Sequence, residues 1–226
     1  MRKLEGNKKT QTVIPVPTIR RFPMYLSFLK SISTEAGKYI SAPDMAGELH
    51  IDPTQISKDF SYLKISGKTK VGYEANTLIS VIEDFLGYHI LRKAVIVGIG
   101  NIGVALIKYN EFKKEGMEII AGFDIDDQVI GQKINNVEIF KMEALSKDFP
   151  KEAVDIGIIA VPGNQAQEVA DIMIESGMKS IWNFSVRPIS ASDNIIIENT
   201  SIESGLAMIK WKLHRNKPLL YKNRML

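Results

Sequence analysis

A glycine-rich turn between two apolar runs constrains the fold of this chain more than any other feature. The run 94–97 leads into Gly98-Ile99-Gly100-Asn101-Ile102-Gly103, a helix-compatible segment follows, and a second apolar run ends at Asp124. In a strand–turn–helix context this GxGxxG spacing is typical of dinucleotide-binding sheets. The first glycine makes the tight turn, the second lets the backbone approach a pyrophosphate, and the third lets the helix pack on the strand.

The acidic residue after the second apolar run indicates which dinucleotide is bound. Asp124 lies 21 residues after Gly103, where a carboxylate accepts hydrogen bonds from the hydroxyls of the adenosine ribose. The same carboxylate repels a 2′-phosphate, so the motif predicts NAD or NADH rather than NADP. The cofactor-contacting residues predicted in this segment are Gly98, Gly100, Asn101, Ile102, Gly103, Asp124, Ile125 and Asp126.

The rest of the chain after residue 91 alternates short apolar runs with helical patterns. This alternation predicts a Rossmann-type, doubly wound parallel sheet in an α/β protein. Ligands bind such sheets at the carboxyl ends of the strands. Strands are expected at 94–97, 119–123, 137–140, 155–161, 180–184 and 194–198, and helices at about 101–114, 142–146, 165–176 and 201–214. The loop after 155–161 adds Val161, Pro162 and Gly163 to the predicted cofactor site.

The segment before the sheet has the pattern of a winged helix. A first helix is expected at 18–34, and Ser41 followed by Pro43 predicts the start of a second that ends near Leu49. A third begins near Pro53, so the second and third form a helix-turn-helix whose second member reads a DNA groove. Residues 66–73 predict a β-hairpin wing in which Val71 and Tyr73 favour a strand. A fourth helix is expected at 75–88.

Charge is segregated along the chain although the overall formal charge is only +3. Residues 1–73 carry 12 Lys/Arg against 6 Asp/Glu, residues 74–200 carry 11 against 19, and residues 201–226 carry 6 against 1. A basic N-terminal segment followed by an acidic central segment indicates that the N-terminal segment binds a polyanion. A merely solvated basic surface is the alternative.

Four segments follow from these patterns. Residues 1–12 are expected to be disordered, 13–90 to form the winged-helix domain, 91–200 the nucleotide domain, and 201–226 a C-terminal helix with a basic tail. Ile202, Leu206, Ile209 and Leu213 lie at helical spacing in that last helix, so its apolar stripe must be buried against something. The candidates are the chain's own sheet and a second copy of the chain.

Several function classes are disfavoured by composition. The chain has no cysteine, so it has no disulfide and no thiolate site, and its three histidines lack metal-ligand spacing. It has no apolar run long enough to span a bilayer and no signal-peptide pattern, so we expect a cytoplasmic protein without a membrane partner. No catalytic residue and no metal site are predicted.

The ordered motifs resemble those of the Rex family of redox-sensing transcriptional repressors. The similarity runs from about residue 13 to 212. The motifs that carry it are Ile14-Pro15 with Thr18-Ile19-Arg20-Arg21 and Tyr25; Gln55 through Tyr62; Val71-Gly72-Tyr73; Gly98 through Gly103 with Ala105-Leu106 and Tyr109; Phe123 through Asp126; Val161-Pro162 with Ala166-Gln167; and Asn183-Phe184.

The resemblance implies a homodimer of winged-helix and Rossmann domains that exchanges its C-terminal helix between subunits. Each sheet would hold one NAD or NADH. The NAD-bound or free form would hold double-stranded operator DNA, and NADH would release it. The resemblance also implies that Tyr109, Asn183 and Phe184 lie near the nicotinamide.

Basic and polar residues cluster on the predicted DNA-binding elements. Those on the recognition helix can address phosphates or base edges, and those at the wing tip suit phosphates or a minor groove. The predicted DNA contacts are Arg20, Arg21, Gln55, Ser57, Lys58, Ser61, Tyr62, Lys68, Thr69 and Lys70.

The sequence departs from the family pattern in the DNA-binding segment and in the switch. Ser57 stands where the family usually has an arginine, and Lys70 replaces a customary wing glycine. The family's redox switch is an arginine of the first helix paired with an aspartate near the partner's C-terminal helix. Those positions correspond to Ser27 and Ser201 here, which predicts a weakened or altered response to NADH.

Two other classes of function remain as alternatives. An NAD-dependent oxidoreductase needs a positioned acid–base group and a second wall for its substrate, and the chain after Ser201 is too short for a substrate domain. A CoA-binding module of the succinyl-CoA-ligase type resembles the sheet loosely, but the winged helix argues against it.

Overall fold

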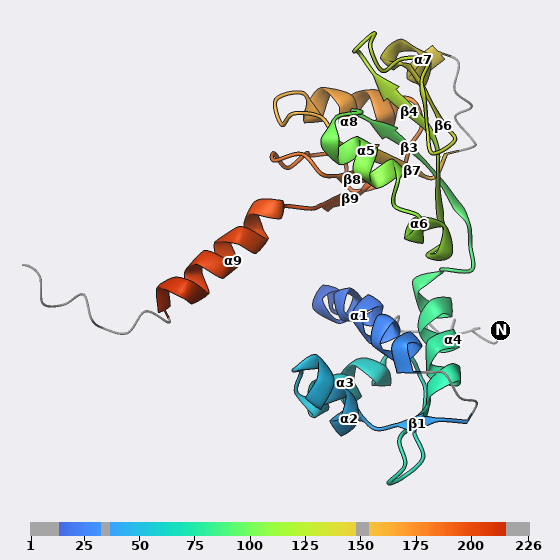
Figure 1. The fold of residues 1–226 in the computed structure, drawn as a ribbon, viewed down its shortest axis with the longest axis vertical. Helices are drawn as coiled ribbons and strands as arrows, with labels where there is room; N and C mark the ends of the chain where they lie inside the picture. Colours follow the sequence, from blue (N-terminus) through green and yellow to red (C-terminus); the bar gives the residue numbers. More distant parts are fainter. Residues whose placement is uncertain (1–13, 33–36, 148–153, 216–226) are drawn as a thin grey trace, which may run out of the picture. The chain divides into compact units, whose positions relative to one another are not determined.

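A computed structural model describes residues 14–32, 37–147 and 154–215 of the chain. The predicted disordered segment 1–12 and the tail 216–226 lie outside the described residues. The chain divides into two units, Met1–His89 and Ile90–Leu226 (Figure 1).

The N-terminal unit is a helical bundle with a small antiparallel sheet. Its apolar core unites the inner faces of the helices, and the largest fully buried side chains are Phe22, Tyr25, Leu29, Met45, Ile56, Phe60, Leu78 and Ile82. Its elements are α1 (Val16–Ile32), β1 (Tyr39–Ile40), α2 (Ala42–Leu49), α3 (Pro53–Ser61), β2 (Tyr73–Glu74) and α4 (Ala75–Leu86). Strands β1 and β2 pair antiparallel.

Local capping explains where the two helices of the helix-turn-helix begin. Ser41 and Asp44 form a capping box at the start of α2, in which each side chain satisfies a backbone N–H of the other. Asp52 caps α3 by accepting a hydrogen bond from the Thr54 N–H at 2.7 Å, and Pro53 occupies the first helical position. The predicted helix-turn-helix is confirmed.

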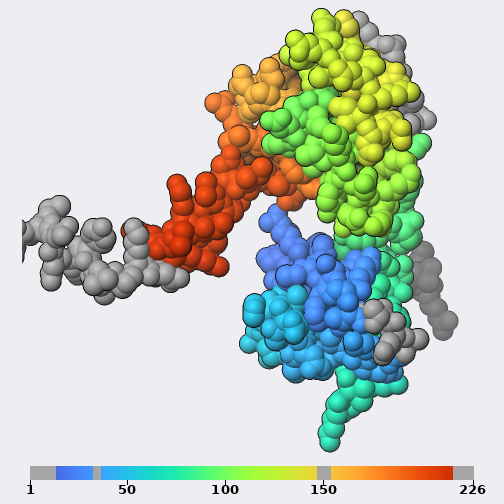
Figure 2. Space-filling model, viewed as in Figure 1, coloured from blue at the N-terminus to red at the C-terminus, as the bar shows by residue number. Residues whose placement is uncertain are grey.

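The predicted wing hairpin is wrong in its details. Lys68 and Gly72 form one isolated bridge that closes the loop Thr69–Val71, and Val71 belongs to no strand. Lys70 (φ 64°) and Gly72 (φ 101°) adopt left-handed backbone, as residues of tight three-residue hairpin loops do, and the pairing is limited to this one antiparallel bridge. Tyr73 does enter a strand, but its partner is β1. The exposed wing loop projects from its unit as a narrow finger (Figure 2).

The C-terminal unit contains the predicted parallel sheet. Its strand order is β5-β6-β4-β3-β7-β8-β9, and all pairs are parallel except β5 with β6. Apart from the β5 edge, this is the 3-2-1-4-5-6 order of dinucleotide-binding sheets, whose order reverses between β3 and β7. The strands are β3 (Arg92–Val97), β4 (Met117–Asp124), β5 (Lys133–Ile134), β6 (Val137–Lys141), β7 (Ile156–Ile159), β8 (Ser180–Asn183) and β9 (Ile196–Asn199).

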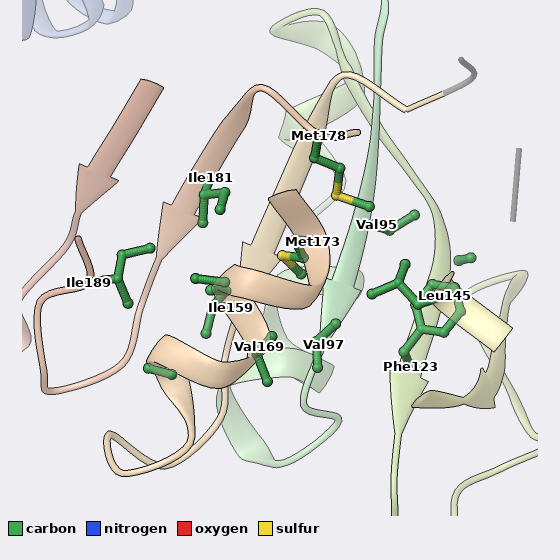
Figure 3. Packing of buried hydrophobic residues seen from close by; sticks show 13 residues of the cluster. Val95, Val97, Phe123, Leu145, Ile159, Val169, Met173, Met178, Ile181 and Ile189 are labelled. Atoms are coloured by element: carbon green, nitrogen blue, oxygen red, sulfur yellow. The ribbon is translucent and has the colours of Figure 1, made fainter. Parts of the chain in front are cut away.

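Alternating side chains of the sheet fill two apolar layers. Val95 and Val97 of β3 point into the layer that α7 (Met142–Lys147) and α8 (Ala166–Glu175) cover, where Met173 and Val169 of α8 face Ile159 (Figure 3). Their neighbours Ala94 and Ile96 point to the opposite layer. Near-continuous burial along β3 and β7 is the signature of central parallel strands.

The predicted helix 101–114 is broken into α5 (Asn101–Ile107) and α6 (Glu111–Lys114). The Asn135 side-chain amide donates to the Ile107 carbonyl at 3.3 Å and to Asn110 Oδ1 at 3.3 Å. Because a distant side chain satisfies a carbonyl at the end of α5, the chain can turn at Lys108–Asn110. Asn135 and Asn136, both with positive φ, form the tight turn between β5 and β6, an edge hairpin that sequence analysis missed.

The last helix, α9 (Ile202–Arg215), exposes every residue, including its apolar stripe. It is the red segment of Figure 2. Among the described residues, no helix is long and apolar enough to cross a membrane.

Gly72 gives a stability prediction for the wing. A Cβ there would overlap the Ile40 carbonyl, and its φ of +101° also penalises any side chain. We expect Gly72→Ala to lower the stability of the N-terminal unit by about 2 kcal/mol or more. The control Gly87→Ala, at φ +73° with nothing within 4 Å of its Cβ, should cost only about 1 kcal/mol.

Urea denaturation followed by far-UV circular dichroism measures the difference. Both tryptophans lie in the C-terminal unit, so their fluorescence reports that unit separately. Equal losses in the two variants would contradict the predicted clash.

Candidate functional site

A cavity of about 420 Å³ lies at the carboxyl ends of β3, β4 and β7, where the strand order reverses. The glycine turn, the end of β4, the loop after β7 and the first turns of α8 enclose it. Its lining residues are Val97, Gly98, Gly100, Asp124, Ile125, Met142, Ala160, Val161, Pro162, Gln165, Glu168, Val169 and Ile172.

The three glycines of the turn play different physical roles. Gly98 has φ +94°, and a Cβ on it would come within 2.7 Å of the Ala160 carbonyl. A Cβ on Gly103 would overlap the carbonyl oxygen of Gly98, so only glycine lets α5 pack on the turn. Gly100 is different, because nothing lies within 4 Å of the Cβ it lacks. The space beside Gly100 is therefore kept clear on the side where a pyrophosphate approaches a dinucleotide-binding turn.

Asp124 fastens the end of β4 to the glycine turn. Its Oδ2 accepts a hydrogen bond from the Ile99 N–H at 2.6 Å, and its Oδ1 accepts from the N–H groups of Ile125 (2.7 Å) and Asp126 (2.9 Å). A carboxylate has about four acceptor positions, so one remains for a ribose hydroxyl. The carboxylate thus shapes the turn and also lines the cavity.

Six of the predicted cofactor residues line this cavity, namely Gly98, Gly100, Asp124, Ile125, Val161 and Pro162. Asn101, Ile102 and Gly103 begin α5 beside it. Gly163 follows Pro162 and lies against the Arg187 side chain. The lining residues Gln165, Glu168 and Met142 were missed, since neither a polar residue nor a methionine in a helical pattern gives a sequence signal for a ligand site.

The residues expected near the nicotinamide lie elsewhere in the unit. Asn183 is fully buried, and its side chain bonds the Arg187 carbonyl, Asn199 Oδ1 and the Ser185 N–H, so it organises the loop after β8. Tyr109 is half exposed and lines a separate cavity of about 440 Å³ on α5 and α6. Consecutive ring contacts join Tyr109, Phe112, Trp182 and Phe184 into an aromatic row.

Four of the ten residues predicted to contact DNA lie on α3, and three of them, Ser57, Lys58 and Ser61, are exposed. Lys58 is exposed, whereas the hydroxyls of Ser57 and Ser61 donate to carbonyls of their own helix, at 3.0 and 2.6 Å. At the wing, the Lys68 ammonium lies 4.7 Å from the ring centre of Tyr39. Tyr62 ends α3 and is half-buried, while Thr69, Lys70 and Arg20 are exposed.

A fully buried carboxylate joins α1 to α3. Asp59 accepts hydrogen bonds from Thr18 (3.0 Å), Tyr25 (2.7 Å) and Gln55 (2.8 Å). Arg21 adds two more, from Nε at 2.6 Å and from Nη2 at 2.7 Å. Arg21 and Gln55, both predicted to contact DNA, therefore donate to a group inside the unit. Thr18, Arg21 and Tyr25 share one face of α1, a spacing from which this network could have been suspected.

The network changes the acidity of its members. Burial alone would raise the pKa of the Asp59 carboxyl, but the hydrogen bonds from Arg21, Tyr25, Thr18 and Gln55 outweigh it and hold that pKa below its usual value. Burial and the hydrogen bond to Asp59 raise the pKa of the Tyr25 phenol. Asp59 is therefore ionised at neutral pH.

Comparison with known proteins assigns the family. Redox-sensing transcriptional repressors named Rex are 38% identical to this chain over 209 residues in Bacteroides fragilis and 37% over 207 residues in Treponema denticola. Both matches cover 92% of this chain, and they cover 95% and 99% of those relatives. This chain belongs to the Rex family.

Family models match the two parts of this Rex chain separately. A model described as “CoA binding domain” matches residues 89–186, and one described as “putative DNA-binding protein N-terminus” matches residues 13–61.

Solved Rex-family structures share the fold. RSP in complex with NAD+ and operator DNA superposes with a TM-score of 0.83 at 29% identity, covering 91% of this chain and 94% of RSP. RSP in complex with NADH gives a TM-score of 0.80 at 29% identity, with coverage of 91% and 96%.

The buried network gives a second stability prediction. Asp59→Asn removes the charge that Arg21 faces. Removing one partner of a buried ion pair lowers the free energy of unfolding by about 3 kcal/mol or more. Because the folded pKa of Asp59 is lowered, this stability is present above the unfolded pKa, about 3.9, and is lost as pH falls through the folded pKa.

We therefore expect wild type and Asp59→Asn to differ strongly at pH 7 and to converge in acid. Urea denaturation by circular dichroism from pH 7 down to below the folded pKa of Asp59 measures this. Asp44→Asn, at an exposed cap, is the control with a smaller loss. A variant as stable as the wild type at pH 7 would contradict the role given to Asp59.

Proposed function

We propose that this Rex-family chain is a transcriptional repressor that binds operator DNA through its N-terminal unit and NAD or NADH through its C-terminal unit. Nucleotide occupancy would couple DNA binding to the NADH/NAD ratio. One observation carries the proposal. The same chain contains a helix-turn-helix and a cavity in which the space beside Gly100 is open and the Asp124 carboxylate lines the wall. The relative RSP, which has the same fold, was solved with NAD+, operator DNA and NADH.

The dinucleotide would lie across the reversal of strand order. Gly100 leaves room for the pyrophosphate, and the Asp124 carboxylate would take a ribose hydroxyl. Ile125, 73% exposed beside the cavity, offers an apolar surface to the adenine. The bound cofactor would bring a nicotinamide that exists in oxidised and reduced forms. Roles of Tyr109, Asn183 and Phe184 toward that ring remain part of the proposal.

DNA binding would use a homodimer. The apolar residues Ile202, Leu206, Ile209 and Leu213 of α9 are all more than half exposed, and burying such a stripe against a second copy removes it from water. Exchange of α9 between subunits would pair two α3 helices for a palindromic operator. Access to operator DNA implies a cytoplasmic location.

We also propose that the NADH switch of this chain is altered. The Ser201 hydroxyl accepts a hydrogen bond from the Ser204 N–H at 3.1 Å, so it caps α9. Ser27 is exposed on α1. Two neutral hydroxyls replace the ion pair of the family, which leaves no stranded charge but also removes the charged contact that the family's switch uses.

The alternative, an NAD-dependent oxidoreductase, has less support. The relatives that share most of the chain's length are named repressors. Incubation with NADH and common oxoacids, followed at 340 nm, tests this alternative.

Gly100→Val tests the nucleotide site. Gly100 has φ −75° and ψ −166°, which other residues adopt, so valine should leave the ligand-free fold intact while filling the pyrophosphate space. We expect the Kd for NADH by calorimetry to rise at least tenfold, about 1.4 kcal/mol. Gly47→Val, at another uncrowded glycine, is the matched control and should keep wild-type affinity.

DNA binding is measured on a duplex that the protein itself selects from a random pool. The wild type should bind it with an affinity that falls as salt rises. NADH should weaken binding more than NAD does, and Gly100→Val should lose this nucleotide effect. A wild type that ignores both nucleotides or retains no duplex would refute the proposal.

The altered switch is tested by restoring the ion pair. The measured quantity is the Kd for DNA in the presence of NADH divided by the Kd for DNA in the presence of NAD. We expect the double variant Ser27→Arg/Ser201→Asp to increase this ratio at least threefold, while neither single variant does. Aspartate still caps α9, so the helix should persist. A wild-type ratio above about 100, near the upper end of typical allosteric couplings, would overturn this part of the proposal.

A further inference from the structure

Gln55 is the residue of the recognition helix whose side chain is held by a buried charge. Its Nε2 donates to Asp59 Oδ1, one helical turn later, at 2.8 Å. Gln55 is half-buried, so part of the residue still faces solvent. Its neighbours on the exposed face, Ser57 and Lys58, have no bond to Asp59 among the described contacts. The carboxylate therefore acts selectively on Gln55.

The chemistry of Asp59 fixes which end of the amide faces inward. An ionised carboxylate only accepts hydrogen bonds, so the amide nitrogen of Gln55 must point to it and the carbonyl oxygen must point away. Within the described part of the chain, no donor reaches the Gln55 Oε1. One N–H of the amide also remains beyond the one given to Asp59.

The carboxylate is also held in place, so it cannot turn away from Gln55. Thr18, Arg21 and Tyr25 of α1 hold both of its oxygens through four hydrogen bonds of 2.6–3.0 Å. The Tyr25 ring also packs edge-on against Phe60, at 5.4 Å between centroids. Helix α1 thus determines the hydrogen-bonding character of a side chain on α3.

We propose that Asp59 makes Gln55 a specificity-determining residue that presents an acceptor to the major groove. This inference rests on the proposed DNA-binding function. Adenine and cytosine offer an exocyclic amino donor there, whereas guanine and thymine offer carbonyl acceptors. The held amide accepts from adenine or cytosine, and adenine can also receive its remaining N–H. Guanine and thymine offer only acceptors there, so the held amide could bind them through its one remaining N–H alone, and its Oε1 would face an acceptor instead of a donor.

Base preference is measured by competition among single-base variants of the selected duplex. We expect Gln55→Met, which has a similar length and no amide, to reduce discrimination at one base pair of each half-site at least fivefold. Gln55→Glu keeps an acceptor but places a second carboxylate beside Asp59, so its overall affinity should fall while adenine or cytosine stays preferred at that position. Every base pair contains adenine or cytosine, so the contacted base is identified by replacing it with an analogue that lacks the exocyclic amino group, purine for adenine or pyrimidin-2-one for cytosine. A wild type whose affinity is unchanged by both replacements at that base pair, or a Gln55→Met variant that loses as much affinity from them as the wild type does, would overturn the inference.

Tyr25→Phe is the matched control. It removes one hydrogen bond from the same carboxylate but leaves the Gln55 bond in place. Its melting temperature should fall while its base preference stays that of the wild type. If Tyr25→Phe changed the preference as much as Gln55→Met, the network would act only by placing the helix, and the inference would fail.

Two outcomes distinguish this inference from the proposed function. A wild type that binds no duplex refutes both. A wild type that binds DNA, with Gln55 variants that share its base preference, refutes only the role of Gln55.

Discussion

Close backbone approach at the glycine turn is the constraint on which the C-terminal unit depends. Strand β3 ends where the sheet order reverses, so the turn after it must fit between β4 and the loop after β7. Gly98 meets the Ala160 backbone there, and Gly103 meets Gly98 itself. Asp124 completes the arrangement by bonding the Ile99 N–H across 25 residues of chain. The cavity exists because these three segments converge without side chains in between.

In the N-terminal unit, α1 and α3 are joined by a buried charged residue, Asp59. Replacing a buried ion pair by apolar residues often leaves stability unchanged or improved, so such a pair is poor evidence for stability alone. Asp59 instead fixes how α3 is oriented relative to α1. Its hydrogen bonds fix the rotation of α3 about its axis relative to α1, which apolar contacts such as Tyr25 with Phe60 constrain only loosely. For a helix that reads a groove, orientation matters more than a small gain in stability.

The features that local sequence determines were predictable. The glycine spacing with Asp124, the caps at Ser41 and Asp52, and the alternation of strands and helices each depend on neighbouring residues, and the structure contains them. The family motifs extended this to the fold of both units, which RSP shares.

Features that depend on distant residues were not predictable in the same way. The break after Ile107 requires Asn135, which approaches only once the β5–β6 hairpin has formed. The wing loop closes with Lys70 in a left-handed conformation that lysine rarely takes, so the residue type gives no signal for this turn. Asp59 is an acidic residue in a polar helix, which a pattern assigns to solvent. Its burial follows from Thr18, Arg21 and Tyr25, about 40 residues earlier in the chain.

The junction between the sheet and α9 limits how the two could communicate. Trp182, inside the aromatic row, donates its indole N–H to Thr200 at 2.8 Å, and Asn183 bonds Asn199 at 2.8 Å. Ser201, the cap of α9, is the next residue. The Thr200 N–H also donates to the Asn183 carbonyl at 2.8 Å, so the backbone that leads into α9 is anchored to β8 immediately before the helix starts.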